Sequence, residues 1–249
     1  MRLTRWIPGL FVGLVLAACS PIHGPDDSHE HPAILLFKGV GASSGSVEAW
    51  QDVLVHMNQK FHAVDSEALN AMSASKLRRY RLLIFPGGNF EALGNSLTPA
   101  TTEHIRSAVR AGTNYLGICA GAFFAGDSPF NGLNLAGGAR FSFYSLEHRG
   151  VRKAAIEIAF PKPETFEHYW EDGPELSGWG EVVAKYPDGT PAVAQGKAGQ
   201  GWMLLTGFHP EASERWRGGM DFHTPVEVNR AYAAVLVDSA LNGKALPHF

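Results

Sequence analysis

The chain has 249 residues, of which 45% are hydrophobic and 18% charged. It is therefore too apolar for a disordered protein and long enough to bury a core without disulfides. The chain has 21 Lys and Arg residues and 24 Asp and Glu residues, which gives a formal charge of −3. Because it also has no basic stretch, we expect no nucleic-acid partner. The two cysteines, Cys19 and Cys119, lie in different sequence contexts, which argues against a disulfide framework.

Residues 1–18 have the pattern of a lipoprotein signal peptide. Two arginines precede an uncharged apolar stretch from Trp6 to Ala18. That stretch is well short of the about 20 residues that a helix needs to cross a bilayer. The sequence Leu-Ala-Ala-Cys at residues 16–19 resembles the bacterial lipobox, in which the cysteine, here Cys19, becomes the lipidated amino terminus. An ordinary cleaved signal with a chance cysteine is the alternative.

A polar segment separates this signal from the rest of the chain. Residues 19–32 are rich in Pro, Gly, Asp and His without apolar periodicity, which predicts a flexible tether rather than a metal site. Composition does not change after it, so a single domain is expected over residues 33–246. We expect the protein to be exported and held at the periplasmic or cell-surface side of a bacterial membrane through lipidated Cys19.

Short apolar runs alternate with helical patterns in the first half of this domain. Ser46 could cap the first of the helices. The alternation predicts a parallel sheet with helices on both faces, a flavodoxin-like or Rossmann-like α/β fold. Strands are expected at residues 33–38, 61–64, 81–85 and 114–118, and helices at 47–57, 69–77 and 98–111.

The second half of the domain is richer in strand patterns. Such a β-rich addition usually extends or flanks the main sheet. A helix over residues 224–241 is expected to close the domain. The strand segments are expected at residues 151–160, 166–170, 181–186, 192–195 and 202–208.

Cys119 lies within the sequence Gly-Ile-Cys-Ala-Gly, between an expected strand and a stretch of small residues that permits a helix. A nucleophile elbow has this context, because its sharp strand-to-helix turn needs side-chain-free neighbours. A buried structural cysteine beside glycines is the alternative. Further motifs elsewhere in the chain favour the elbow.

Two such motifs follow other expected strands. His209 and Glu211 come directly after one, and this spacing lets the histidine take the thiol proton of Cys119 while the carboxylate orients the ring. A Pro-Gly-Gly turn follows another strand, where the N–H of Gly88 could join that of Ala120 to hold an oxyanion. The sequence therefore predicts a catalytic site at the strand ends.

This set of motifs resembles the class I glutamine amidotransferase-like superfamily over roughly residues 33–211. The segments 86–88, 117–122, 169–174 and 209–211 are most similar to the domain at the amino terminus of eukaryotic biotin-protein ligases and to free-standing bacterial proteins. The resemblance implies the α/β fold, the same three catalytic residues and no cofactor. Glutamine-using members follow the cysteine with a leucine and then a glutamine, whereas residues 120–124 are Ala-Gly-Ala-Phe-Phe, so hydrolysis or acyl transfer is expected instead.

Residues near the motifs are candidates for the substrate pocket. For His168, packing is the alternative to a place in the pocket, because aromatic-rich strands pack more often than they bind. No spacing of His, Cys, Asp or Glu predicts a metal site. The pocket candidates are Gly87, Asn89, Phe123, His168 and Tyr169.

Three functions stay open at this stage. The first is a Cys-His-Glu hydrolase or acyl transferase acting on an amide or ester of an exported small molecule or peptide. The second is a catalytically silent lipoprotein that binds a ligand or acts as a scaffold. The third is a thiol redox sensor that oxidises at Cys119.

The lipobox resemblance makes a prediction about residue 19. Metabolic labelling with a fatty-acid analogue should tag the wild-type protein and fail to tag Cys19→Ala, because the thiol is the attachment point. In-gel fluorescence of the labelled protein measures this, with Cys119→Ala as the control that keeps the label. A Cys19→Ala protein that is still tagged would contradict lipidation at this residue.

Overall fold

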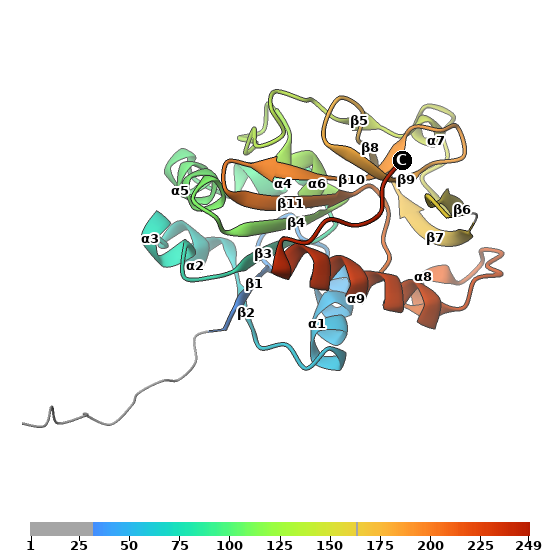
Figure 1. Cartoon of the computed structure of the whole chain (residues 1–249), viewed down its shortest axis with the longest axis horizontal. Coiled ribbons are helices and arrows are strands. Elements are labelled where there is room, and N and C mark those ends of the chain that lie inside the picture. The colour runs from blue at the N-terminus through green and yellow to red at the C-terminus, as the bar shows by residue number, and fades with distance from the viewer. Residues whose placement is uncertain (1–31, 163) are drawn as a thin grey trace, which may run out of the picture. The chain divides into compact units, whose positions relative to one another are not determined.

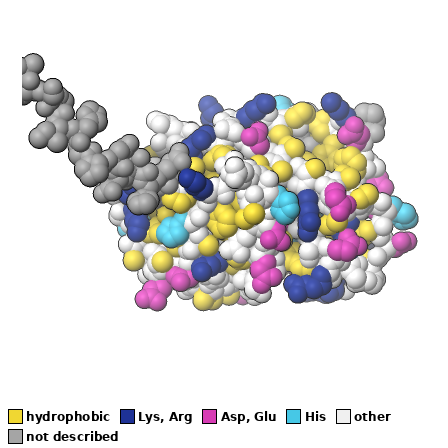
Figure 2. All heavy atoms as spheres, turned by 90° about the horizontal axis from the view of Figure 1, so that it is seen from below, with side chains coloured by type: hydrophobic (Ala, Val, Ile, Leu, Met, Phe, Trp, Pro, Cys, Tyr) yellow, Lys and Arg dark blue, Asp and Glu magenta, His cyan; other side chains and the backbone are white. Residues whose placement is uncertain are grey.

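The computed structural model describes residues 32–162 and 164–249 (Figure 1). The predicted signal peptide and Cys19 lie outside the described residues, as does all of the tether but residue 32, and they stay predictions. None of the helices described is long and apolar enough to span a membrane. On the face seen in Figure 2, acidic and basic side chains are interspersed with apolar ones.

Five parallel strands form one half of the main sheet, in the order β2-β1-β3-β4-β11. With β11 as the fifth strand, this is the 2-1-3-4-5 order of flavodoxin-like sheets, and the predicted fold class is confirmed. Every residue of β1 and β3 is buried, which explains their continuous apolar sequences. The strands are β1 (Ile34–Phe37), β2 (Phe61–Val64), β3 (Leu82–Phe85), β4 (Asn114–Ile118) and β11 (Gly201–Thr206).

Antiparallel strands continue this sheet beyond β11, in the order β10-β9-β6-β7. The β-rich second half therefore extends the sheet, and β7 forms its edge. A separate two-stranded pair is formed by β5 (Ser142–Phe143) and β8 (Pro174–Glu175). The added strands are β6 (Lys153–Ala159), β7 (Thr165–Glu171), β9 (Glu181–Lys185) and β10 (Pro191–Ala198).

Helices cover both faces of the sheet and enclose two hydrophobic cores. Alternate residues of β1 enter different cores, Leu35 one and Leu36 the other, as the period of a strand requires. Helices α5 (Pro99–Arg110) and α6 (Ala120–Ala125) pack on the first core, and α1 (Ser44–His56) and α9 (Val226–Asn242) on the second. The short helices are α2 (Ser66–Asn70), α3 (Ala74–Leu77), α4 (Phe90–Asn95), α7 (Ser145–His148) and α8 (Glu214–Arg217).

Two sequence expectations about helices are wrong. The single helix expected over residues 69–77 is two helices, because the Asp65 and Ser73 side chains each accept a backbone N–H and begin a new one. Ser46 does not cap α1, whose N-cap is Ser43. Ser46 lies inside the first turn of α1, and its hydroxyl is used elsewhere.

Helix α6 lies unusually close to β3 and β4. A Cβ atom on Gly121 would lie 2.0 Å from the Phe85 carbonyl oxygen, and one on Gly117 would lie 2.6 Å from the Gly121 carbonyl oxygen. Neither contact could relax by moving a flexible side chain, because backbone atoms form both. The glycines on either side of Cys119 therefore allow the sharp junction between strand and helix.

The substitution Gly121→Ala should lower the free energy of unfolding by about 1–3 kcal/mol, since overpacking outweighs the better helix propensity of alanine. Urea denaturation measures the difference. Gly218→Ala is the matched control, because its Cβ would meet only the Arg215 carbonyl at 3.5 Å and its φ is −51°. Equal stability of the two variants would contradict the close packing of α6.

Candidate active site

The three catalytic candidates and the oxyanion candidate Gly88 come from neighbouring strand ends. Cys119 directly follows β4, Gly88 lies after β3, and His209 and Glu211 come after β11. These three strands are adjacent and parallel, so their carboxyl ends share one edge of the sheet. Open α/β sheets bind their ligands along this edge.

Cys119 has a backbone conformation that side chains rarely adopt, with φ of 48° and ψ of −101°. Such a residue costs roughly 1–3 kcal/mol and persists where its surroundings fix it. Here the Cys119 N–H donates to the Thr206 carbonyl at 2.8 Å, and its carbonyl accepts from two N–H groups of α6 at 3.0 Å. The thiol is buried and donates to the Glu171 carbonyl oxygen at 3.6 Å.

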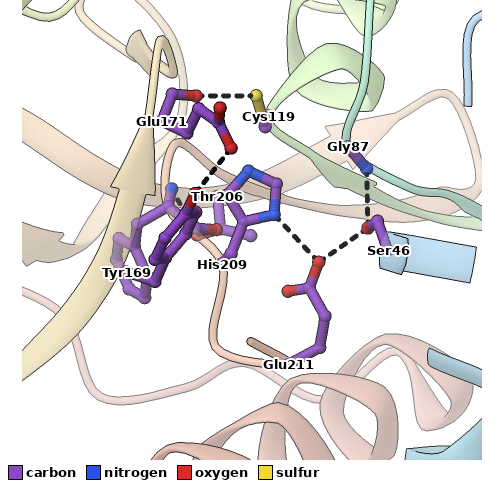
Figure 3. Close-up of polar contacts among 9 residues, drawn as sticks. Ser46, Gly87, Cys119, Tyr169, Glu171, Thr206, His209 and Glu211 are labelled. Carbon is purple, nitrogen blue, oxygen red and sulfur yellow. Dashed lines mark hydrogen bonds and ion pairs between the residues drawn. The ribbon is translucent and has the colours of Figure 1, made fainter. Parts of the chain in front are cut away.

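A chain of buried hydrogen bonds runs from His209 toward α1 (Figure 3). His209 Nδ1 and Glu211 Oε1 are 2.9 Å apart. The same oxygen accepts from the Ser46 hydroxyl at 2.7 Å, and this hydroxyl accepts the Gly87 N–H at 3.1 Å. Glu211 therefore holds the imidazole directly, and α1 and the turn after β3 support Glu211 through Ser46 and Gly87.

The electrostatic environment favours the protonated form of His209. Burial opposes the charge, but the Glu211 carboxylate and hydrogen bonding with Cys119 outweigh it and hold the pKa of His209 well above 6.5. A raised pKa makes the imidazole a stronger base toward a neighbouring thiol. Glu211 is therefore placed to orient His209 and to increase its basicity.

Aromatic rings and a glycine fix the plane of the His209 ring. Tyr169 and Trp216 approach it edge-on, with ring centroids 5.8 and 5.6 Å away. The Tyr169 carbonyl also accepts the His209 N–H at 2.8 Å. On another side, a Cβ atom at Gly87 would lie 2.2 Å from His209 Cε1, so only glycine fits there.

The oxyanion candidates are backbone groups beside Cys119. Gly88 has φ of +149°, and a Cβ atom there would lie 2.0 Å from the Gly41 carbonyl oxygen, so this turn requires glycine. Ala120 is the first residue of α6, where a backbone N–H has no acceptor within the helix. Gly88 lies in the turn after β3 and lines the same cavity as Cys119, and Ala120 follows Cys119 directly in the chain.

A cavity of about 600 Å³ opens over Cys119 and His209. Tyr169 is a wall of this cavity, and its hydroxyl donates to the Glu171 carboxylate at 2.7 Å. Burial and this carboxylate raise the pKa of Tyr169, which keeps the phenol protonated. The lining residues are Ser43, Gly45, Gly88, Cys119, Lys153, Tyr169, Glu171, Asp172, His209, Arg215, Trp216 and Gly218.

Some pocket candidates lie outside this lining. Gly87 packs beneath His209, Asn89 caps α4 through Oδ1, and Phe123 is buried against other rings of the first core. His168 is fully buried against Phe208, and burial, assisted by the Arg217 cation, lowers its pKa to about 3. His168 is therefore a packing residue, which was the alternative to a place in the pocket. Adjacent residues of a strand point to opposite faces, so Tyr169 faces the cavity and His168 faces the core.

The structure adds residues that the sequence motifs did not indicate. Ser46 was interpreted as a helix cap, and Trp216 lies in the short helix α8, which no periodicity in the sequence predicted. Glu171 falls within the segment 169–174 that carries the family resemblance, which is the only signal that pointed toward it. Across residues 32–162 and 164–249, no group of His, Cys, Asp or Glu side chains could hold a metal ion.

Comparisons with known proteins give two kinds of relative. The family model described as "Biotin-protein ligase, N terminal" matches residues 32–151. A biotin–protein ligase of Schizosaccharomyces pombe is 26% identical over 72% of this chain, which spans about a third (33%) of that relative's length. The pyridoxal 5'-phosphate synthase subunit PdxT of Pyrobaculum neutrophilum is 29% identical and matches 59% of this chain and 78% of its own.

Solved structures share the fold at low sequence identity. A crystal structure of a glutamine amidotransferase has a TM-score of 0.60 and 19% identity, and the match covers 85% of this chain and 99% of the other. The exo-β-1,4-mannosidase Op5Man5 of Opitutaceae bacterium strain TAV5 has a TM-score of 0.53 and 14% identity, covering 83% of this chain and 36% of its own. The mannosidase shows that proteins of different names contain this fold.

The raised pKa of His209 predicts a dependence of stability on pH. Below about pH 6.5, the value in an unfolded chain, pairing with Glu211 contributes fully, and the contribution is lost as pH rises through the raised folded pKa. The advantage of wild type over Glu211→Gln in free energy of unfolding should therefore be largest near about pH 6 and shrink at higher pH. Urea denaturation across this range measures it. A difference independent of pH would contradict the pairing.

Proposed function

Because the chain has a class I glutamine amidotransferase-like fold and matches the biotin-protein ligase amino-terminal family, we propose that it is a cysteine hydrolase or acyl transferase. One observation carries the proposal: Cys119 and His209 line one open cavity, and the buried Glu211 carboxylate lies behind His209, 2.9 Å from its Nδ1. A structural cysteine would need neither a buried histidine–carboxylate pair nor an opening to solvent.

The proposed reaction begins when Cys119 Sγ attacks the carbonyl carbon of an amide or ester. The thiol proton passes to His209, whose other nitrogen donates to Glu211. The N–H groups of Gly88 and Ala120 stabilise the oxyanion. His209 then gives its proton to the leaving amine or alcohol, and the carbon–sulfur bond remains as a thioester. Water or an acceptor, deprotonated by His209, cleaves this thioester and the proton returns to sulfur.

The cavity supports a small molecule or a peptide end as the substrate. Its volume falls within the range of small-molecule sites. Lys153 and Arg215 supply positive charge, and Glu171 and Asp172 supply negative charge, so a polar substrate fits better than a lipid.

Helix α6 argues against glutamine as that substrate. All of its residues are buried and apolar, so the stretch that holds glutamine in other members offers no side-chain hydrogen bond. We therefore propose hydrolysis or transfer of another acyl group, carried out by a protein that is exported and anchored through Cys19.

The three proposed residues should differ in their effects on turnover. Cys119→Ser should lower kcat/KM by about 10³-fold or more, because the hydroxyl is a poor nucleophile in a site built for sulfur. Glu211→Gln should lower kcat/KM by a smaller factor, about 10–100-fold, since His209 can still reach the thiol part of the time. A panel of chromogenic amide, thioester and ester substrates measures both, and mass spectrometry detects the acyl-enzyme.

Lys197→Ala, on the distant strand β10, is the control for these assays. A Cys119→Ser protein that turns over substrate as well as wild type would make Cys119 structural and favour the ligand-binding alternative. Reversible oxidation of Cys119 without turnover of any panel substrate would favour the thiol sensor instead.

A further inference from the structure

Ser46 contacts one of the proposed catalytic residues, Glu211, and does not line the cavity. It is fully buried in the first turn of α1 and is not among the residues that line the cavity. Its hydroxyl lies between the Glu211 carboxylate and the Gly87 backbone. Ser46 therefore cannot contact a substrate there, and any effect it has on the chemistry passes through these two neighbours.

The hydrogen bonds of Ser46 have a fixed direction. The Gly87 N–H can only donate, so the Ser46 oxygen accepts from it. The single hydroxyl proton of Ser46 is then free for Glu211 Oε1, which acts as an acceptor. His209 Nδ1 must donate to the same oxygen, which leaves the other ring nitrogen for Cys119. A backbone amide thus sets the direction of the whole chain of bonds.

Glu211 depends on Ser46 for its orientation. Its second oxygen, Oε2, is buried and has no hydrogen-bond partner among the described residues. Oε1 alone receives the two donors, from Ser46 and from His209. Without the hydroxyl, the carboxylate would keep one partner, the Gly87 N–H would lose its acceptor, and the carboxylate would be free to turn.

We propose that Ser46 is a positioning residue that couples the loop carrying Gly88 to the carboxylate that orients His209. The inference rests on the proposed function, because it assigns Ser46 to the same site. Gly87 precedes the oxyanion residue Gly88, so one buried hydroxyl ties the oxyanion turn to the base. Ser46 acts through Glu211 and Gly87 and makes no contact with reacting atoms.

A double-mutant cycle tests this coupling without a known substrate. The rate of Cys119 alkylation by iodoacetamide is measured in the full chain by peptide mass spectrometry at neutral pH. Ser46→Ala should lower the rate by about 3–10-fold in the wild-type background. In the Glu211→Gln background the same substitution should change it by less than about twofold, because the path through Glu211 is already broken.

Two further variants separate positioning from a loss of stability. Ser239→Ala removes another buried hydroxyl, which donates to the Lys244 carbonyl in a distant part of the fold, and should leave the alkylation rate unchanged. Ser46→Cys fills the same space with a weak donor and should give an intermediate rate, which also provides a measurement if Ser46→Ala does not fold.

The outcomes distinguish this inference from the proposed function. An equal effect of Ser46→Ala in both backgrounds overturns the positioning role, since Ser46 would then act independently of Glu211. An alkylation rate that Glu211→Gln leaves unchanged overturns the catalytic arrangement itself, and the inference about Ser46 falls with it. A rate lowered equally by Ser239→Ala would show that the readout follows stability and would also overturn the positioning role.

Discussion

The buried Glu211 carboxylate is the constraint on which the site depends. A charge removed from water costs several kcal/mol unless it is paired and hydrogen-bonded, so its neighbours must be held in place. Here His209 lies after β11 and Ser46 lies in α1, and Ser46 in turn holds Gly87 after β3. One carboxylate and the hydroxyl bound to it thereby join segments that are distant in the sequence, and they link His209 to the turn that contains Gly87. The strained Cys119 backbone completes the arrangement from β4.

Much of the fold and part of the site followed from the sequence, for a physical reason. Strands such as Phe61–Val64 and Asn114–Ile118 have the predicted bounds, because buried parallel strands need short, mostly apolar runs. The placement of the candidates Cys119, His209 and Glu211 at strand ends could be expected, because each lies within a few residues of the end of such a run. Ser46 and Trp216 were not, because their positions depend on how α1 and the loop around α8 pack, which no local periodicity encodes.

The sheet of this protein is shared with other proteins, whereas the residues that line its cavity come from segments outside the parallel strands. The biotin–protein ligase and the PdxT subunit named above are similar to this chain in sequence, and the glutamine amidotransferase is similar in fold, yet the three have different names, so the sheet alone does not determine a substrate. What distinguishes this chain is local. Helix α6 offers no polar side chain, while the charged groups of the cavity come from β6, from the end of β7 and from the region of α8. Specificity therefore has to be sought in those segments.

The β6–β7 hairpin, which lines part of the cavity, is paired with the rest of the sheet at few positions. β7 is the edge strand, and β6 is paired with β9 at one position, Ala159 with Lys185. Toward the segment after β11, β7 has the isolated bridge between Tyr169 and His209. Lys153, Tyr169 and Glu171, which line the cavity, thus belong to a hairpin that has few strand-pairing contacts with the rest of the sheet, although its apolar side chains pack in the second core. A change in this hairpin would therefore reshape one side of the cavity while β4 and β11, which precede Cys119 and His209, kept their pairing.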